Sequence, residues 1–85
     1  MVTQNLSYNY DTRHDVLYVS IGFPRPSYGD EIYPGIVLKH DIDTDELTGV
    51  TILDCKARYL ENDPVLTELP SELAGIDFEV GLLIT

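Results

Sequence analysis

The chain has 85 residues, which suits one domain spanning residues 1–85. Its 15 acidic and 5 basic residues give a formal net charge of −10, which disfavours nucleic acid and anionic membranes as partners because phosphate binding needs Lys and Arg. Hydrophobic residues make up 44% of the chain, too many for a disordered protein, and no apolar run is long enough to span a membrane.

Two segments near the N-terminus predict a β-hairpin. Residues 6–10, LSYNY, alternate between apolar and polar positions, and residues 16–22, VLYVSIG, are rich in β-branched and aromatic side chains. The polar stretch DTRHD between them is typical of a turn. The next stretch, residues 23–30 (FPRPSYGD), contains two prolines and a glycine, and this composition predicts a loop.

A second hairpin is predicted further along the chain. Residues 32–40, IYPGIVLKH, form its first strand, whose beginning is weakened by Pro34 and Gly35. Residues 47–54, LTGVTILD, alternate again and form its second strand. The acidic segment HDIDTDE connects these two strands.

The pattern then changes to that of short helices. Asp54 is a candidate N-cap for a helix over residues 55–60, CKARYL. Asp63 followed by proline predicts a second helix start, and Ser71 a third. Residues 76–84, IDFEVGLLI, alternate once more, which indicates a C-terminal strand or an irregularly packed chain end. The predicted fold is α+β: a small antiparallel β-meander of about four strands in chain order, followed by short helices and this C-terminal segment.

The acidic turn at residues 41–46 is a candidate metal site because Asp41, Asp43 and Asp45 stand at alternate positions. A calcium-binding EF-hand loop also needs glycine at its sixth position and glutamate at its twelfth. Counted from Asp41, those positions hold Glu46 and Ile52. The interpretation is therefore a hairpin turn, in which aspartate side chains accept hydrogen bonds from nearby backbone N–H groups. A weak cation site in this turn remains the alternative, as does a zinc or manganese site formed by His40 with Asp41 and Asp43.

Other residues with chemical potential have a simpler structural interpretation. A His–Asp pair suited to acid–base catalysis is present among Asp11, His14 and Asp15. These residues lie on a predicted turn, however, where aspartate side chains typically accept hydrogen bonds from the backbone. Cys55 starts a predicted helix beside basic residues, which favours the thiolate, but a buried apolar role fits a lone cysteine better. Tyr28 and Tyr33 flank the proline-rich loop and are candidates for a contact patch.

Three stretches resemble the small bacterial family called domain of unknown function 2283: YDTRHDVLYV at 10–19, PGIVLKHD at 34–41 and TGVTILD at 48–54. The residues that match the family pattern are Tyr10, Asp11, Asp15, Leu17, Tyr18, Glu31, Gly35, Asp41, Gly49, Ile52, Leu53 and Asp54. The resemblance covers residues 6–60. The chain departs from the pattern at Asp45 and Glu46, where the family usually has a glycine, and the tail 61–85 lies outside it.

This resemblance implies a compact β-meander followed by a helix, and it implies no activity, cofactor or catalytic residue. Some family members look like the smaller partner of a toxin-like gene pair, which implies an antitoxin-like role in binding a basic protein. The sequence thus predicts a non-enzymatic protein-interaction module without cofactor or metal. The alternative is a small metal-binding protein or metal-dependent enzyme that uses the acidic turn 41–46.

Two further expectations concern the state of the protein in the cell. A single cysteine cannot form an intrachain disulfide, which favours the cytoplasm. A short chain leaves apolar surface uncovered, and an open sheet leaves edge strands unpaired, so a homodimer formed through residues 76–84 is predicted. Six acidic residues and no basic one follow position 60, and their repulsion predicts that the dimer strengthens with salt.

Overall fold

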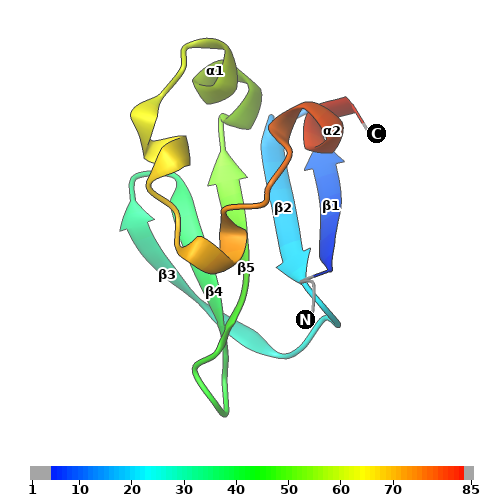
Figure 1. The fold of residues 1–85 in the computed structure, drawn as a ribbon, viewed down its shortest axis with the longest axis vertical. Helices are drawn as coiled ribbons and strands as arrows, with labels where there is room; N and C mark the ends of the chain where they lie inside the picture. The colour runs from blue at the N-terminus through cyan, green and yellow to red at the C-terminus, as the bar shows by residue number, and fades with distance from the viewer. Residues whose placement is uncertain (1–4, 84–85) are drawn as a thin grey trace.

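The computed structural model describes residues 5–83, which form one antiparallel sheet and a layer of short helical turns (Figure 1). The strands are β1 (Leu6–Asp11), β2 (Val16–Ile21), β3 (Ser27–Tyr33), β4 (Ile36–Asp41) and β5 (Leu47–Leu53). The helical elements are α1 (Cys55–Leu60), the 3-10 turns η1 (Pro64–Thr67) and η2 (Ser71–Leu73), and α2 (Phe78–Leu83). The predicted α+β class, an antiparallel sheet followed by short helices, is confirmed.

The number and order of the strands differ from the prediction. The sheet has five strands in the order β1-β2-β5-β4-β3, so β5 lies in the centre, between the two hairpins (Figure 1). The predicted chain order is therefore wrong. The loop predicted for residues 23–30 ends at Pro26, and residues 27–33 form the edge strand β3. Pro34 and Gly35 are the turn between β3 and β4, and Gly35 has a φ of 83°, a left-handed conformation that glycine adopts without strain.

The hydrophobic core lies between one face of the sheet and the C-terminal layer, which comprises residues 55–83. Alternation in β2, β4 and β5 points one set of side chains to this face. The buried cluster consists of Leu17, Val19, Ile21, Ile36, Leu38, Val50, Ile52, Cys55, Val65 and Leu73. The opposite face of the sheet carries no helix in the described residues and is called the open face (Figure 1).

The C-terminal strand predicted for residues 76–84 is wrong. Residues 78–83 form helix α2, which packs on β1 (Figure 1), and Ile84 lies outside the described residues. The Asp77 carboxylate accepts a hydrogen bond from the backbone N–H of Val80 at 3.0 Å, as an N-capping residue does. Gly81 is buried against Tyr8. The alternating apolar residues fit a strand, but residues three or four apart share one face of a helix. Alternation alone therefore did not determine which of the two forms.

The N-terminus of helix α1 is capped from another part of the chain. Asp54 occupies the N-cap position but makes no side-chain capping bond, contrary to the prediction. The Asp15 carboxylate, from the turn between β1 and β2, instead accepts hydrogen bonds from the backbone N–H groups of Lys56 at 2.7 Å and Ala57 at 3.2 Å. The predicted cap at Asp63 is confirmed, since its side chain accepts from the Val65 N–H.

The C-terminal layer follows a curved path over the sheet. It runs from α1 through η1 and η2 and then to α2 beside β1 and β2 (Figure 1). Arg58 joins its first part to the sheet by donating to the carbonyl oxygens of Leu53 and Pro34, and it also pairs with Asp63 at 3.1 Å. No helix within residues 5–83 has the length and apolar character needed to cross a membrane.

Candidate functional site

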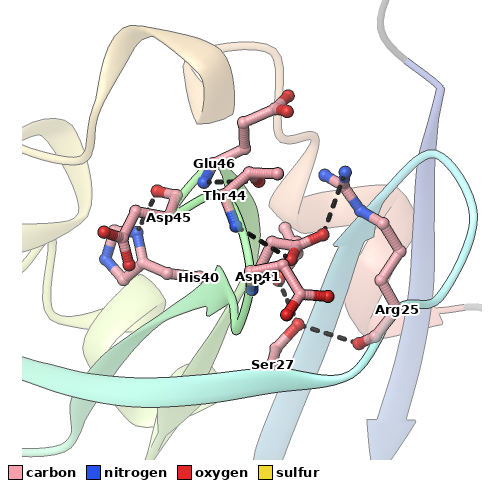
Figure 2. A network of polar contacts seen from close by, with 9 residues as sticks. Arg25, Ser27, His40, Asp41, Thr44, Asp45 and Glu46 are labelled. Carbon is pink, nitrogen blue, oxygen red and sulfur yellow. Dashed lines mark hydrogen bonds and ion pairs between the residues drawn. The ribbon is translucent and has the colours of Figure 1, made fainter.

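The acidic turn between β4 and β5 is held by its own side chains (Figure 2). The Asp41 carboxylate accepts hydrogen bonds from the backbone N–H groups of Asp43 at 2.7 Å and Thr44 at 3.2 Å. Its second oxygen lies 3.2 Å from the Arg25 guanidinium. The backbone N–H of Asp41 also donates to the Glu46 carbonyl. Asp41 therefore acts as a turn former, which confirms the hairpin-turn interpretation.

His40 lies beside this turn and contacts Asp45 within the turn and Tyr28 on β3. Its Nδ1 is 3.3 Å from the Asp45 carbonyl oxygen, and its ring stacks on Tyr28 with the centroids 5.4 Å apart. Tyr28 donates its hydroxyl to the Asp45 carboxylate at 2.7 Å. Across the described part of the chain, no three histidine, cysteine or acidic side chains come together as ligands for one metal ion. Asp41 is thus engaged with the turn backbone and Arg25, and Asp45 with Tyr28.

Asp11 and His14 form a local contact on the surface. The His14 Nδ1 lies 2.8 Å from the Asp11 carboxylate, whose other oxygen accepts from the backbone N–H groups of Arg13 and His14. The hydrogen bond from the His14 side chain lowers the pKa of Asp11. An aspartate that closes a turn in this way has the structural role expected from its position.

Asp15 connects three elements of the fold and does not join Asp11 and His14 in a common site. Besides capping α1, it accepts a hydrogen bond from the Tyr10 hydroxyl at 2.7 Å. Burial opposes ionisation of Asp15, but the hydrogen bonds from Tyr10, Lys56 and Ala57 hold its pKa below the usual value. Burial, together with the bond to Asp15, raises the pKa of Tyr10 to about 12. These contacts identify Asp15 as a structural carboxylate.

Cys55 is fully buried in the core beneath the start of α1. Burial, followed by the nearby Asp15 carboxylate, raises the pKa of its thiol to about 12. The thiolate is therefore disfavoured, although the thiol stands at a helix N-terminus. The interpretation of Cys55 as a small buried apolar residue is confirmed.

Tyr28 and Tyr33 do not form the single contact patch considered for them. They stand near opposite ends of β3, separated by about 16 Å of extended strand. Tyr28 is engaged with His40 and Asp45, as described above. Each residue is partly exposed, at 43% for Tyr28 and 38% for Tyr33, which fits tyrosines whose rings partly cover a sheet.

Sequence reasoning missed a concave site in the C-terminal layer. A hollow of about 340 Å³ adjoins a second one of about 210 Å³, and the two share Leu66, Thr67 and Phe78 in their walls. The other lining residues are Tyr59, Asn62, Asp63, Leu69, Leu73, Ala74 and Ile76. We call the pair the apolar hollow, because most of these side chains are apolar. Pro64, Pro70 and Gly75 were the available signal, since such residues divide a segment into short turns.

The surroundings of the apolar hollow are acidic. The C-terminal layer has six acidic residues after position 60 and no basic one. Five of them are exposed: Glu61, Glu68, Glu72, Asp77 and Glu79. Asp63 is half-buried and already paired with Arg58. Each of these five exposed residues is next in sequence to a residue that lines the apolar hollow, and we call the five the acidic rim. An apolar lining beside acidic residues suits a ligand that is apolar at its centre and cationic at its edges.

No family model, curated protein or solved structure matches this chain. The resemblance noted over residues 6–60 therefore remains a prediction, and the site is interpreted from its own geometry.

Proposed function

We propose that this protein is a non-enzymatic interaction module whose apolar hollow receives an amphipathic segment of a basic partner protein. The observation that carries the proposal is the apolar hollow with its acidic rim. Leu66 and Phe78 are only half-buried by the chain's own packing. Burying a fully exposed side chain of this kind contributes about 1.5–3 kcal/mol, so covering the remaining half of Leu66 or Phe78 contributes about 1 kcal/mol each. Two or three apolar anchors from a partner would add the burial of their own side chains and so give useful affinity.

Charge favours a basic partner over a second copy of this chain. Two acidic rims placed face to face would repel each other, whereas Lys or Arg side chains around an apolar anchor would pair with the rim. The chain's net charge of −10 would also speed association with a cationic protein. An antitoxin-like role, inhibition of a basic protein by covering its surface, fits this chemistry.

Binding suits the apolar hollow better than catalysis does. Its titratable lining residues among those described are Tyr59 and Asp63. The Asp63 carboxylate is already bonded to Arg58 and to the backbone N–H of Val65. No nucleophile and base converge there in the described chain, and such convergence is what acid–base chemistry needs. The lone buried cysteine agrees with a reducing compartment, and we propose the cytoplasm.

The test uses a labelled amphipathic peptide of leucine and lysine as probe, with binding followed by fluorescence anisotropy. Thr67→Arg places a cationic side chain at the wall shared by both hollows, at an exposed position that leaves the core intact. Thr12→Arg makes the same change on the exposed β1–β2 turn and is the matched control. Because both variants alter the net charge equally, non-specific attraction changes equally in both.

We expect binding below about 100 µM for the wild type and the Thr12 variant, and at least about tenfold weaker binding for the Thr67 variant. Equal affinity of the two variants, or no binding by the wild type, would overturn the proposal. Sedimentation of the same three proteins measures their oligomeric state and so tests the homodimer predicted from the sequence. If the wild type is a dimer and only Thr67→Arg dissociates it, the occupant of the apolar hollow is a second copy of the chain. That result would also overturn the proposal of a basic partner protein.

A further inference from the structure

The open face of the sheet has a concavity of its own, on the other side from the apolar hollow. It has a volume of about 230 Å³ and lies between strands β2, β4 and β5 and the loop that leads into β3. Its polar lining includes Tyr18, Ser20, Arg25, Lys39 and Thr51. We call it the Lys39 depression. Pockets for drug-sized molecules start at about 300 Å³, so this one suits a small ion or a single functional group.

The strand register explains why the open face is hollow at this point. Lys39 pairs with Gly29 on one side and with Gly49 on the other, and Gly49 also pairs with Ser20. The row across the sheet therefore has no large side chain beside Lys39. A Cβ atom on Gly49 would collide with the backbone carbonyl oxygen of Val19. Backbone packing thus excludes a larger residue there and keeps the depression open.

The charge in the Lys39 depression is opposite to that of the whole chain. Two of the 5 basic side chains line it, and none of its described lining residues is acidic, although the chain has 15 acidic residues. Lys39 is half-buried and makes no hydrogen bond or ion pair within residues 5–83. Arg25 pairs with Asp41 (Figure 2), but a guanidinium has five N–H donors and keeps others available.

We propose that the Lys39 depression binds a small oxyanion, a carboxylate or phosphate group. The Lys39 ammonium supplies the charge, and the remaining N–H donors of Arg25 add to it. Tyr18, Ser20 and Thr51 line the same depression, and each carries a hydroxyl group that can donate to a further anion oxygen. Physiological salt screens the net negative charge of the chain beyond about 8 Å, so local donors govern the interaction. This site does not rest on the proposed function.

The experiment is an amide NMR titration of the full chain with sodium phosphate at pH 7, repeated with acetate and with chloride at matched ionic strength. We expect saturable shifts with phosphate at the amides of Ser20, Gly49 and Thr51, at a Kd of millimolar order or below. Acetate separates the two oxyanion classes: shifts with both anions define a general oxyanion site, and shifts with phosphate alone define a phosphate site. Chloride shifts of equal size at the same amides would overturn the proposal.

Lys39→Met keeps most of the side-chain stem and removes the charge, and Lys56→Met makes the same change at an exposed position on α1. The amide spectrum of each variant shows directly whether it is folded. We expect the Lys39 variant to bind phosphate at least about tenfold more weakly, as loss of a charged hydrogen bond predicts, and the Lys56 variant to match the wild type. Equal saturation curves for the two variants would show that the depression is not the binding site.

Discussion

The replacement Asp15→Asn examines the contact that ties the first hairpin to helix α1. Asparagine has the same shape and tolerates the left-handed conformation of this position, whose φ is 54°. The substitution removes the negative charge and one acceptor oxygen. One Asp15 oxygen accepts from both the Tyr10 hydroxyl and the Lys56 N–H, and the other accepts from the Ala57 N–H. The asparagine NH₂ group would then face one of these donors.

The expected loss is about 2 kcal/mol in the free energy of unfolding. A donor left without its acceptor at the start of α1 costs about 1 kcal/mol, and weakening of the charge-assisted bonds to neutral ones adds a similar amount. The partial exposure of Asp15 keeps the total from rising further. For a chain of this size, the melting temperature would fall by about 10 °C.

Urea unfolding followed by circular dichroism measures this difference, with Asp43→Asn as the control because the Asp43 side chain is exposed on the acidic turn. Although burial works against ionisation, hydrogen bonds hold the folded-state pKa of Asp15 below its unfolded value. The stabilisation by Asp15 is therefore complete above about pH 4 and is lost as the pH falls through the folded-state pKa. A deficit below about 0.5 kcal/mol at pH 7, or one that does not shrink in acid, would refute the reasoning.

Three further predictions concern a glycine, the thiol and calcium. In urea unfolding, Gly49→Ala should destabilise the fold by several kcal/mol because its Cβ would meet the Val19 carbonyl oxygen. The control Gly75→Ala, whose Cβ would enter open space, should change stability by less than about 1 kcal/mol. Cys55 should react with a disulfide reagent such as DTNB only as fast as the chain unfolds, since its thiol is buried with a pKa of about 12; rapid native-state labelling at pH 8 would contradict this. Millimolar calcium should leave the melting temperature within about 2 °C, and a larger rise in a thermal scan would show that the acidic turn binds the ion.

The strongly patterned strands and the first helix were predictable from the sequence. The strands of the first hairpin, the central strand β5 and helix α1 follow their predicted bounds closely, because buried strands alternate and turn residues delimit them. Strand β3 was missed because it is an edge strand whose residues are mostly exposed, so it has no apolar alternation to detect. Its composition, with Asp30 and Glu31 beside Gly29, resembles a loop.

The contacts that place the candidate site depend on distant residues, and no local pattern reveals them. Asp54 has the residue type of a helix N-cap, but Asp15, from another turn, occupies that role. The apolar hollow depends on how η1, η2 and α2 curve over the sheet, and single-sequence periodicity carries no information on that path. Asp77 was a local signal for helix α2, yet the alternating apolar residues after it fit a strand equally well.

The central position of β5 has a consequence for how the protein folds. The β1–β2 and β3–β4 hairpins pair residues that are near in sequence and can form early, in microseconds. Neither hairpin contacts the other through the sheet until β5 enters between them, with Leu17 and Ile36 both pairing with Ile52. Insertion of this last strand is therefore the step that closes the long-range contacts, and such closure sets folding rates in small domains. During synthesis the two hairpins therefore stay unconnected until β5 has left the ribosome, and the sheet closes only after that.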